Sequence, residues 1–389
     1  MKVNRKIAFV IFSDPMIYPP TMNAAAILAD HGFEVDIFGL HYHSGDYIEP
    51  ALGVKVHYLG ELRKGIWFRF DFARFCIQVV LAASFKQYQW IFSYNMTGVL
   101  PGYLAARLSG ARWLYHNHDL TPVRGKWGFY PFLNRMEKLA SRRADLVVFP
   151  QAERAELFAD SAGLKRKPLI VGNGPRRGWG DIVDLEREIL DFRSRWGQVV
   201  IYQGGLNWMR GLRRVIESMP YWDVPAGLLL VGGTGLQPSF SEDAMAIART
   251  LGVQDRLLIK STIPYLDLPR FTKACDIGLG VMATTEDDSC LNIRYLAGAS
   301  NKLAEYMSCG LPVVVPASET YRGFIEDNGV GILVDNSSPQ NIAAGLNKLF
   351  LNSAMREEIS ARAKTHFASS LSYEAQFQPV LEAVSRDVD

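Results

Sequence analysis

Strands and helices alternate from the first residues of this chain onwards, and that order restricts the fold more than any other feature. A continuous apolar run at 7–12 predicts a buried strand, residues 21–31 predict a helix that ends at Gly32, and residues 34–40 predict a second strand. Such a βαβ unit has a right-handed crossover and parallel strands. The alternation then continues, with further strands predicted over 54–59, 90–94, 112–115, 144–150, 169–171, 198–202, 227–231, 256–259, 277–281, 313–315 and 331–335.

The chain is long enough for two such sheets. Its 389 residues exceed what one hydrophobic core usually serves. The segment 172–180 is rich in Gly, Pro and Arg, which is typical of a linker, and the strand-first pattern restarts after it. We therefore predict an α/β protein of two facing, doubly wound parallel-sheet domains with a cleft between them, over residues 1–172 and 173–372.

Composition excludes several classes of protein. Hydrophobic residues make up 48% of the chain and charged residues 21%, with a net charge of +2, so nothing indicates nucleic-acid binding. The four cysteines have no CxxC spacing, which argues against a zinc site or a disulfide framework and favours a reducing compartment. The apolar run at 7–12 is too short for a signal peptide, and no uncharged run of 18 residues occurs, so we expect a cytoplasmic protein.

The stretch from Ser300 to Pro316 reads as a capped helix that leads into a buried strand. Ser300 suits the N-cap, where its hydroxyl can accept a hydrogen bond from a first-turn N–H. Gly310 suits the left-handed position after the helix, and Pro312 prevents the helix from continuing. The three valines at 313–315 predict a strand that is covered on both faces.

Three polar side chains in that helix form a candidate anion site. Asn301 and Glu305 share one helix face with Lys302 beside them, in the first two turns, where the helix dipole favours anions. The carboxylate of Glu305 would suit the paired hydroxyls of a ribose. The alternative interpretation is a solvated helix face that carries an ordinary Lys–Glu pair.

Glycine-rich turns follow two strands of the second half. The turn at 203–211 contains Gly204 and Gly205 and ends near Arg210, so its N–H groups and one cation could approach a phosphate. The turn at 232–235, which includes Gly233, is a weaker signal of the same kind. Plain tight turns are the alternative. The acidic turn 284–289 could bind a metal, although a solvated loop is the simpler interpretation.

Polar residues also gather at the end of a strand in the first half. His116, His118 and Asp119 follow the strand at 112–115, and ligands of open α/β sheets collect at the carboxyl ends of strands. A metal site built on the two histidines is a weaker alternative, because nothing nearby completes a ligand set. Asn23, at the start of the first predicted helix, is a further candidate.

Two segments of the first half combine aromatic and basic residues. Residues 61–89 and 123–143 are rich in both, and Glu137 is the single acid between 121 and 144. Such a pattern can place an enzyme on an anionic membrane surface, here the inner face of the membrane. The alternative is that the aromatic residues belong to the core and the basic residues to a solvated face.

The stretch 300–314 resembles the nucleotide-sugar signature of glycosyltransferase family 4, whose members are retaining enzymes of the GT-B fold. The resemblance extends over 274–279, 292–295 and 328–335. It implies that Glu305 holds the donor ribose, that His118 contacts the sugar, and that the loop 261–264 reads the base. The family often has a glutamate eight residues before Glu305, where this chain has Ala297; a subgroup with an Asn…Tyr…Asn-Lys pattern fits this chain.

The resemblance implies transfer of a sugar, with retention, from a nucleotide-diphosphate sugar to an acceptor hydroxyl in polysaccharide, glycolipid or glycoconjugate biosynthesis. It also implies that no metal is required and that the final helix, about 373–389, crosses back to the first domain. A nucleotide-sugar 2-epimerase and a non-catalytic partner subunit are the alternatives. The expected residues are His118, Arg210, Lys302 and Glu305 for catalysis; Gly204, Gly205, Gly233, Thr262, Asn292, Tyr295, Ser300 and Asn301 for the donor; and Asn23, His116 and Asp119 on the acceptor side.

Overall fold

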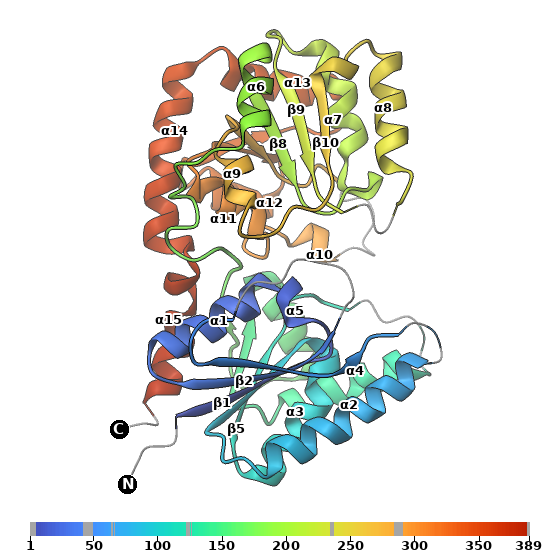
Figure 1. Cartoon of the computed structure of the whole chain (residues 1–389), viewed down its shortest axis with the longest axis vertical. Helices are drawn as coiled ribbons and strands as arrows, with labels where there is room; N and C mark the ends of the chain where they lie inside the picture. Colours follow the sequence, from blue (N-terminus) through green and yellow to red (C-terminus); the bar gives the residue numbers. More distant parts are fainter. Residues whose placement is uncertain are drawn as a thin grey trace. The chain divides into compact units, whose positions relative to one another are not determined.

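The structure is a computed structural model (Figure 1) that describes residues 5–41, 50–63, 65, 67–121, 125, 127–233, 237–283 and 291–386. The predicted acidic turn 284–289 lies outside these residues. Contacts divide the chain into two compact units. Unit 1 comprises Met1–Asn173 and Gln376–Asp389, and unit 2 comprises Gly174–Ala375.

Unit 1 is built on a seven-stranded parallel sheet with the order β3-β2-β1-β4-β5-β6-β7. β1 lies between β2 and β4, with Ile7 paired to Val35 on one side and to Trp90 on the other. The strands are β1 (Lys6–Ile11), β2 (Glu34–His41), β3 (Val54–Glu61), β4 (Trp90–Tyr94), β5 (Arg112–His116), β6 (Leu146–Phe149) and β7 (Leu169–Ile170).

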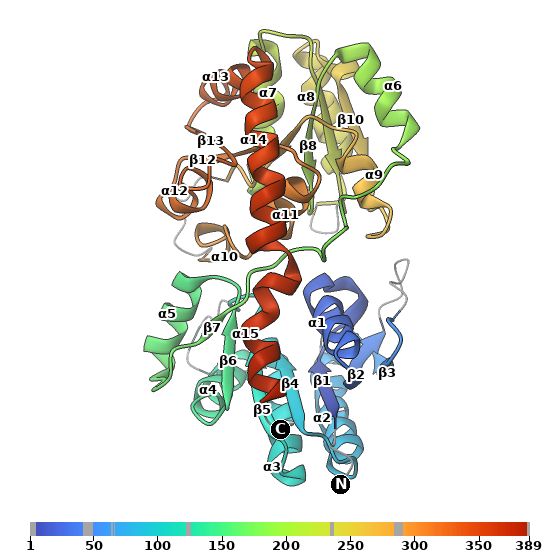
Figure 2. The same ribbon diagram turned by 90° about the vertical axis from the view of Figure 1, so that its left-hand side faces the viewer.

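Helices cover both faces of this sheet. α2 (Trp67–Ser84), α3 (Asn95–Ser109), α4 (Phe129–Ser141) and α5 (Ala152–Ala162) contribute to one core, which contains Phe75, Val99, Leu133 and Phe158. α1 (Pro19–Asp30) and the last part of α15 (Tyr373–Ser385) lie in front of the sheet in Figure 2.

Unit 2 contains a six-stranded parallel sheet with the order β10-β9-β8-β11-β12-β13. Its strands are β8 (Val199–Gln203), β9 (Gly227–Val231), β10 (Leu257–Lys260), β11 (Ile277–Leu279), β12 (Val313–Pro316) and β13 (Gly331–Val334). Every strand predicted from the sequence is present, and the prediction of two parallel-sheet α/β domains is confirmed.

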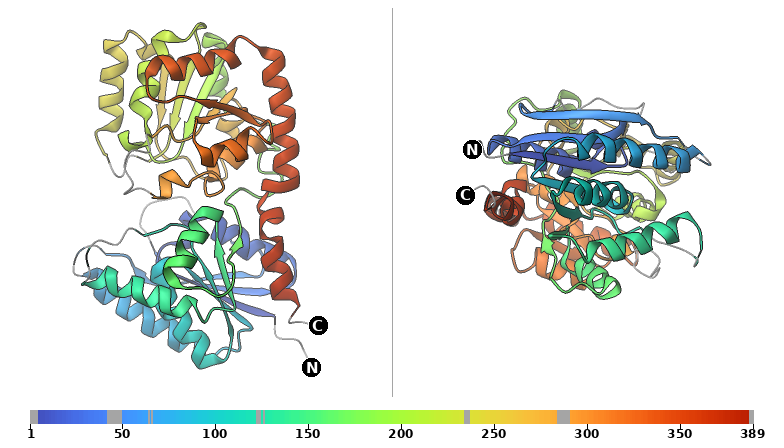
Figure 3. Two further views of the ribbon diagram at one scale, coloured as in Figure 1. Left: turned by 180° about the vertical axis from the view of Figure 1, so that it is seen from behind. Right: turned by 90° about the horizontal axis from the view of Figure 1, so that it is seen from below.

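Figure 3 shows the helices and the sheet of unit 2 from behind. Two hydrophobic cores fill the spaces between them. One core is shared with α7 (Leu212–Ser218), α8 (Phe240–Thr250) and α13 (Pro339–Phe350). The other involves α6 (Arg187–Trp196), α9 (Leu268–Thr272), α11 (Asn301–Ser308) and α12 (Glu319–Ile325). The remaining helices are α10 (Leu291–Arg294) and α14 (Ser353–His366).

The helix that carries the candidate anion site, α11, ends as predicted but begins differently. Gly310 has a φ of +78°, a left-handed conformation that glycine adopts without strain. Ser300 occupies the N-cap, but its hydroxyl accepts no capping hydrogen bond, so that prediction is wrong. A capping hydroxyl would accept a hydrogen bond from the N–H of Leu303. That N–H donates instead to the Ser300 carbonyl at 3.3 Å.

Candidate active site

Backbone hydrogen bonds join three loops at the carboxyl edge of the unit 2 sheet. The N–H of Gly204, after β8, donates to the carbonyl of Val231 at 2.9 Å, and the N–H of Leu206 donates to the carbonyl of Gly233 at 2.9 Å. The N–H of Gly232, after β9, donates to the carbonyl of Lys260 at 3.1 Å. These bonds hold the loops after β8, β9 and β10 together where ligands of parallel sheets bind.

The glycines in these loops allow a close approach of backbone to backbone. Gly232 has a φ of +150°, and a Cβ at this position would lie 1.8 Å from the carbonyl oxygen of Gly204. A Cβ at Gly233 would lie 3.1 Å from Oγ1 of Thr262. Gly205 is exposed beside them. The structure therefore brings the predicted residues Gly204, Gly205, Gly233 and Thr262 into one loop cluster.

Lys302 reaches this cluster from α11. A Cβ on Gly204 would lie 3.3 Å from its Nζ, which also sits 5.2 Å from the centre of the Tyr202 ring. Burial and, to a smaller extent, the nearby Arg210 guanidinium lower the pKa of Lys302 to about 8, against the opposing effect of Glu305. Among the described residues, neither Lys302 nor Arg210 has an acid within ion-pair distance, so both charges are available to an anion.

Glu305 is the buried acid of the same helix, with only 4% of its surface exposed. Nε2 of Gln203 donates to its carboxylate, and Oε1 of Gln203 accepts from Oγ1 of Thr272 at 2.8 Å, which fixes the orientation of the amide. Burial raises the pKa of Glu305 to about 7 against the opposing effects of Gln203, Lys302 and Tyr265. The Tyr265 hydroxyl lies near this carboxylate without a well-aligned hydrogen bond.

These contacts contradict the alternative of a solvated Lys–Glu pair. Glu305 is bonded to Gln203 inside the protein, and in the described part of the chain Lys302 and Glu305 do not form an ion pair. Oδ1 of Asn301 is also buried without a hydrogen-bond partner among the described residues. Two unpaired cations and a helix N-terminus lie together here, an arrangement that suits an anion such as a diphosphate.

Gln203 and Thr272, which orient Glu305, were not predicted from the sequence. Gln203 ends the apolar strand β8, and a polar residue at that edge is the signal that could have identified it. Asn292 lies on the short helix α10 and Tyr295 directly follows it; the Arg294 guanidinium sits 5.6 Å from the Tyr295 ring centre. Ala297 is buried in the core beneath α11, so its role is packing.

In unit 1, His118 is fixed by contacts from four elements. Its Nε2 lies 3.2 Å from Oγ1 of Thr21 on α1, and its N–H donates to Oδ1 of Asn95 at 2.8 Å. Its carbonyl accepts from Nη1 of the fully buried Arg154 at 3.0 Å. The ring also stacks on Tyr94 at 5.3 Å. His118 is therefore held rigidly at the carboxyl end of β5.

Both histidines at this edge are neutral. Burial lowers the pKa of His118 to about 3 and that of His116 well below its usual value. Nδ1 of His118 and Nε2 of His116 are buried and lack a hydrogen-bond partner within the described chain. These nitrogens have a hydrogen-bonding capacity that no described residue uses, and in the described segments no three His, Cys, Asp or Glu side chains gather as metal ligands would.

Two of the residues that fix His118 were not predicted. Asn95 adopts a φ of +58°, a left-handed conformation that Asn tolerates better than most residues. Its place directly after strand 90–94 was an available signal. Arg154 also lies 3.6 Å from Asp119, which is 66% exposed. Nothing in the local sequence distinguishes Arg154 from a surface residue of an amphipathic helix.

Asn23 differs from its expected position. α1 begins at Pro19, so Asn23 lies in its second turn and not at its start. Glu137, the single acid of the basic segment 123–143, is 6% exposed, and burial raises its pKa to about 7. The Tyr115 hydroxyl donates to Glu137, and Nδ2 of Asn117 donates to that hydroxyl at 2.8 Å, which ties the histidine loop to α4.

Comparisons with known proteins cover both units. Residues 20–174 match the model of a glycosyl transferase 4-like domain, and residues 191–366 match the model of glycosyl transferases group 1. D-inositol 3-phosphate glycosyltransferase of Xylanimonas cellulosilytica is 24% identical over 166 residues. That match covers 43% of this chain and 37% of that enzyme.

Solved structures show the GT-B fold over the whole chain. Sucrose-phosphate synthase from Thermosynechococcus elongatus superposes with a TM-score of 0.75 at 16% identity, over 98% of each chain. HepE from Anabaena, in complex with UDP and glucose, gives a TM-score of 0.73 at 17% identity and covers 98% of this chain and all of that one. A UDP-N-acetylglucosamine 2-epimerase-like protein from Listeria monocytogenes gives 0.61 at 14% identity, over 99% of this chain and 97% of that one.

Proposed function

Since this chain is a glycosyltransferase of the group 1 type, we propose that it transfers a sugar, with retention, from a nucleotide-diphosphate sugar to an acceptor hydroxyl. The observation that carries this proposal is the pair of unpaired cations, Lys302 and Arg210, beside the glycine loops of unit 2. A diphosphate bound beside the glycine loops would be stabilised by both positive charges. HepE was solved with UDP and with UDP-glucose, so UDP is the first nucleotide to test.

In the proposed reaction, negative charge develops on the departing diphosphate. Lys302, Arg210 and the N-terminus of α11 stabilise that charge, and preorganised electrostatics of this kind is usually the largest catalytic effect. Glu305 accepts hydrogen bonds from the ribose hydroxyls. His118, as a neutral imidazole, positions the transferred sugar, and the reaction requires no metal.

A thermal-shift experiment tests the donor site. A nucleotide that binds only the folded protein raises the melting temperature in a concentration-dependent way. We expect one of UDP, GDP, ADP and CMP to raise it without added metal. In the Glu305→Ala protein the shift should be much smaller, because the ribose loses its carboxylate partner; Glu357→Ala, which changes an exposed acid of the same unit, is the control. The absence of any shift with the wild type would contradict the donor site.

Transfer is distinguished from epimerisation by the products. When only the nucleotide sugar is present, a transferase leaves it unchanged or hydrolyses it slowly to the free sugar. An epimerase converts the nucleotide sugar to its epimer. NMR of the sugar after incubation measures this directly. Accumulation of the epimer would exclude the proposed reaction.

We further propose that unit 1 contacts an anionic membrane surface during this reaction and that the acceptor is a lipid-linked saccharide. The N-terminal ends of α2 and α4 meet through the rings of Phe68 and Phe129, whose centres are 5.8 Å apart. Exposed aromatic side chains surround this contact, among them Trp127 at 85% exposure. They are Trp67, Phe70, Trp127, Tyr130 and Phe132. The proposed association is peripheral. No described helix has the length and apolar character to cross a bilayer.

Co-sedimentation with vesicles tests the membrane proposal. Wild-type protein should sediment with vesicles that contain phosphatidylglycerol at low salt, and less so at high salt, because exposed charges are screened. A Trp67→Ser/Phe70→Ser variant should sediment less. Sedimentation that is equal with neutral and anionic vesicles, or absent from both, would contradict the proposal.

A further inference from the structure

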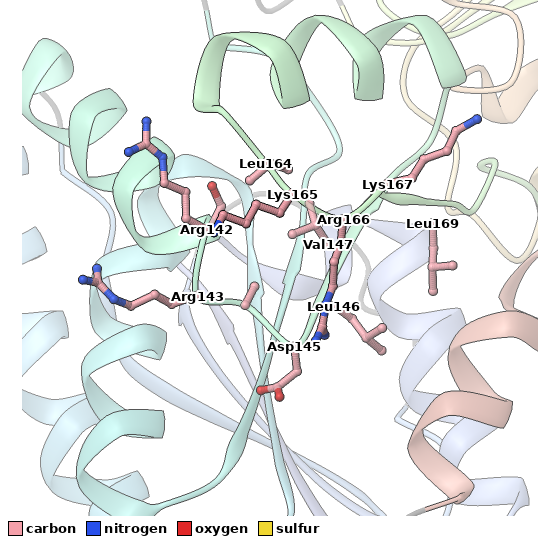
Figure 4. A pocket seen from close by; sticks show the side chains of 12 residues that line it. Arg142, Arg143, Asp145, Leu146, Val147, Leu164, Lys165, Arg166, Lys167 and Leu169 are labelled. Atoms are coloured by element: carbon pink, nitrogen blue, oxygen red, sulfur yellow. The ribbon is translucent and has the colours of Figure 1, made fainter.

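A basic hollow lies on unit 1, away from the histidine loop. It has a volume of about 460 Å³ and is lined by two sequence segments that are distant along the chain, 141–147 and 164–169 (Figure 4). These segments contribute five cations: Arg142, Arg143, Lys165, Arg166 and Lys167. Asp145 is the single acid in the lining.

The hollow is separate from the candidate active site. Oδ2 of Asp145 accepts from the N–H of Trp113 at 2.9 Å, near the amino end of β5. His118 follows the carboxyl end of the same strand, so the two places are separated by the length of β5, roughly 15 Å. The cations of the hollow therefore take no part in the chemistry assigned to His118.

The charge of the hollow is not balanced by the protein. Asp145 is already engaged by Trp113 and by Nε of Arg112, which lies 3.5 Å from its carboxylate. α4 and α5 both end at the hollow, and each helix C-terminus carries about half a negative charge. Those two ends account for about one of the five cations, which leaves about four positive charges.

Only one of the five cations has a structural task. Nε of Arg142 donates to the carbonyl of Ala162 in the last turn of α5, and a Cβ on Gly163 would lie 3.6 Å from Nη2 of Arg142. This contact holds the two basic segments together. Within the described residues, Arg143, Lys165, Arg166 and Lys167 have neither an ion pair nor a side-chain hydrogen bond, so their charges are free for a ligand.

We propose that this hollow is a second anion-binding site of the protein, and that it takes a phosphate-bearing group. The charged ends of Arg142 and Arg143 point to one side in Figure 4 and that of Lys167 to the other, so a bound ligand would draw these exposed, flexible side chains inward. Cations carried on two linked walls suit a ligand with more than one negative charge, and guanidinium groups bind phosphate oxygens in pairs. The phosphate belongs either to a soluble molecule or to a lipid headgroup, and the chemistry of recognition is the same for both.

Calorimetric titration with inorganic pyrophosphate tests the proposal. The full chain is titrated at low ionic strength in the presence of saturating UDP, so that the donor site is occupied, and again as the Lys302→Ala protein. We expect binding in both backgrounds, and binding about tenfold weaker or more in a Lys165→Glu/Lys167→Glu variant. The matched control is Lys55→Glu/Arg107→Glu, which changes the net charge equally at exposed positions elsewhere on unit 1.

Each outcome decides one question. Pyrophosphate binding that is unaffected by the Lys165/Lys167 reversal, or weakened equally by the control, overturns the site. If the reversal weakens pyrophosphate binding alone, the ligand is soluble; if it also abolishes sedimentation with phosphatidylglycerol vesicles, the ligand is a headgroup. If neither pyrophosphate nor these vesicles respond to the reversal, the proposal is wrong. Binding in the Lys302→Ala protein keeps this result independent of the proposed donor site.

Discussion

Replacing Lys302 by alanine is expected to lower kcat/KM by about a hundredfold to a thousandfold, the range seen when one preorganised group that stabilises developing charge is removed. Lys302 is the cation that lies against Gly204, and in the described residues it has no acid to pair with. Its loss removes a charge that no neighbouring side chain replaces. The measurement is the initial rate with donor and acceptor, together with the affinity for the nucleotide.

The pH dependence provides a sharper test of the same residue. Burial lowers the pKa of Lys302 to about 8, so in the free enzyme the ammonium loses its proton as the pH rises above that value. We expect kcat/KM of the wild type to fall in this range. A Lys302→Arg variant stays protonated and should lack this fall, even if its absolute rate is lower. Lys348→Ala, on the exposed face of α13, is the control. A Lys302→Ala enzyme as active as that control would remove Lys302 from the site.

Replacing His118 by alanine is expected to lower kcat by roughly a hundredfold while the thermal shift caused by the nucleotide stays unchanged. The histidine belongs to unit 1, and the anion site belongs to unit 2. Because the pKa of His118 is about 3, its imidazole is neutral from pH 5 to pH 8, and the rate should show no ionisation of this residue over that range.

The control for His118 is His31→Ala, which changes an exposed histidine after α1. Circular dichroism of both variants should match the wild type, since the loop around His118 is also held by Asn95 and Arg154. An equal loss of nucleotide binding and turnover in His118→Ala would indicate disruption of the fold, and an unchanged kcat would exclude a role in positioning the sugar.

The strands of both sheets could be predicted from the sequence to within two residues at each end. Strands that are buried on both faces require continuous apolar runs, and runs such as 7–12 and 313–315 are visible without any structure. The sequence also shows the glycines of the loops after β8 and β9, and it shows Lys302 and Glu305 on one helix, because the spacing in each case is local. These features specify the edge of the sheet at which the candidate site lies.

α2 and α6 are among the helices that were not predicted. α2 has apolar side chains on all sides, with Phe75 buried and Phe70 exposed, so no helical stripe appears in its sequence and tertiary packing decides its structure. α6 has five charged residues among its ten and fully buries Ile189 alone, yet Ile189, Phe192 and Trp196 recur at helical spacing, so its sequence carried a signal that was overlooked.

The residues that orient the site were harder to predict than those that form it. Arg154, Glu137 and Thr272 act on partners 36, 22 and 69 positions away. No periodicity joins such positions. The failure of Ser300 as a hydroxyl cap has a similar origin, because the choice between its hydroxyl and its carbonyl depends on backbone geometry and not on residue type.

The chain passes from unit 1 to unit 2 after Asn173 and returns after Ala375. Unit 2 is therefore one continuous segment, whereas unit 1 needs both its long first part and its short last part. In that last part Phe377, Val380 and Val384 are almost fully buried, and the Gln376 side chain accepts from the N–H of Gly172 at 2.7 Å. On the ribosome, unit 2 can complete its fold while unit 1, although synthesised first, still exposes an apolar strip. Unit 1 is thus the later of the two to become protease-resistant during synthesis.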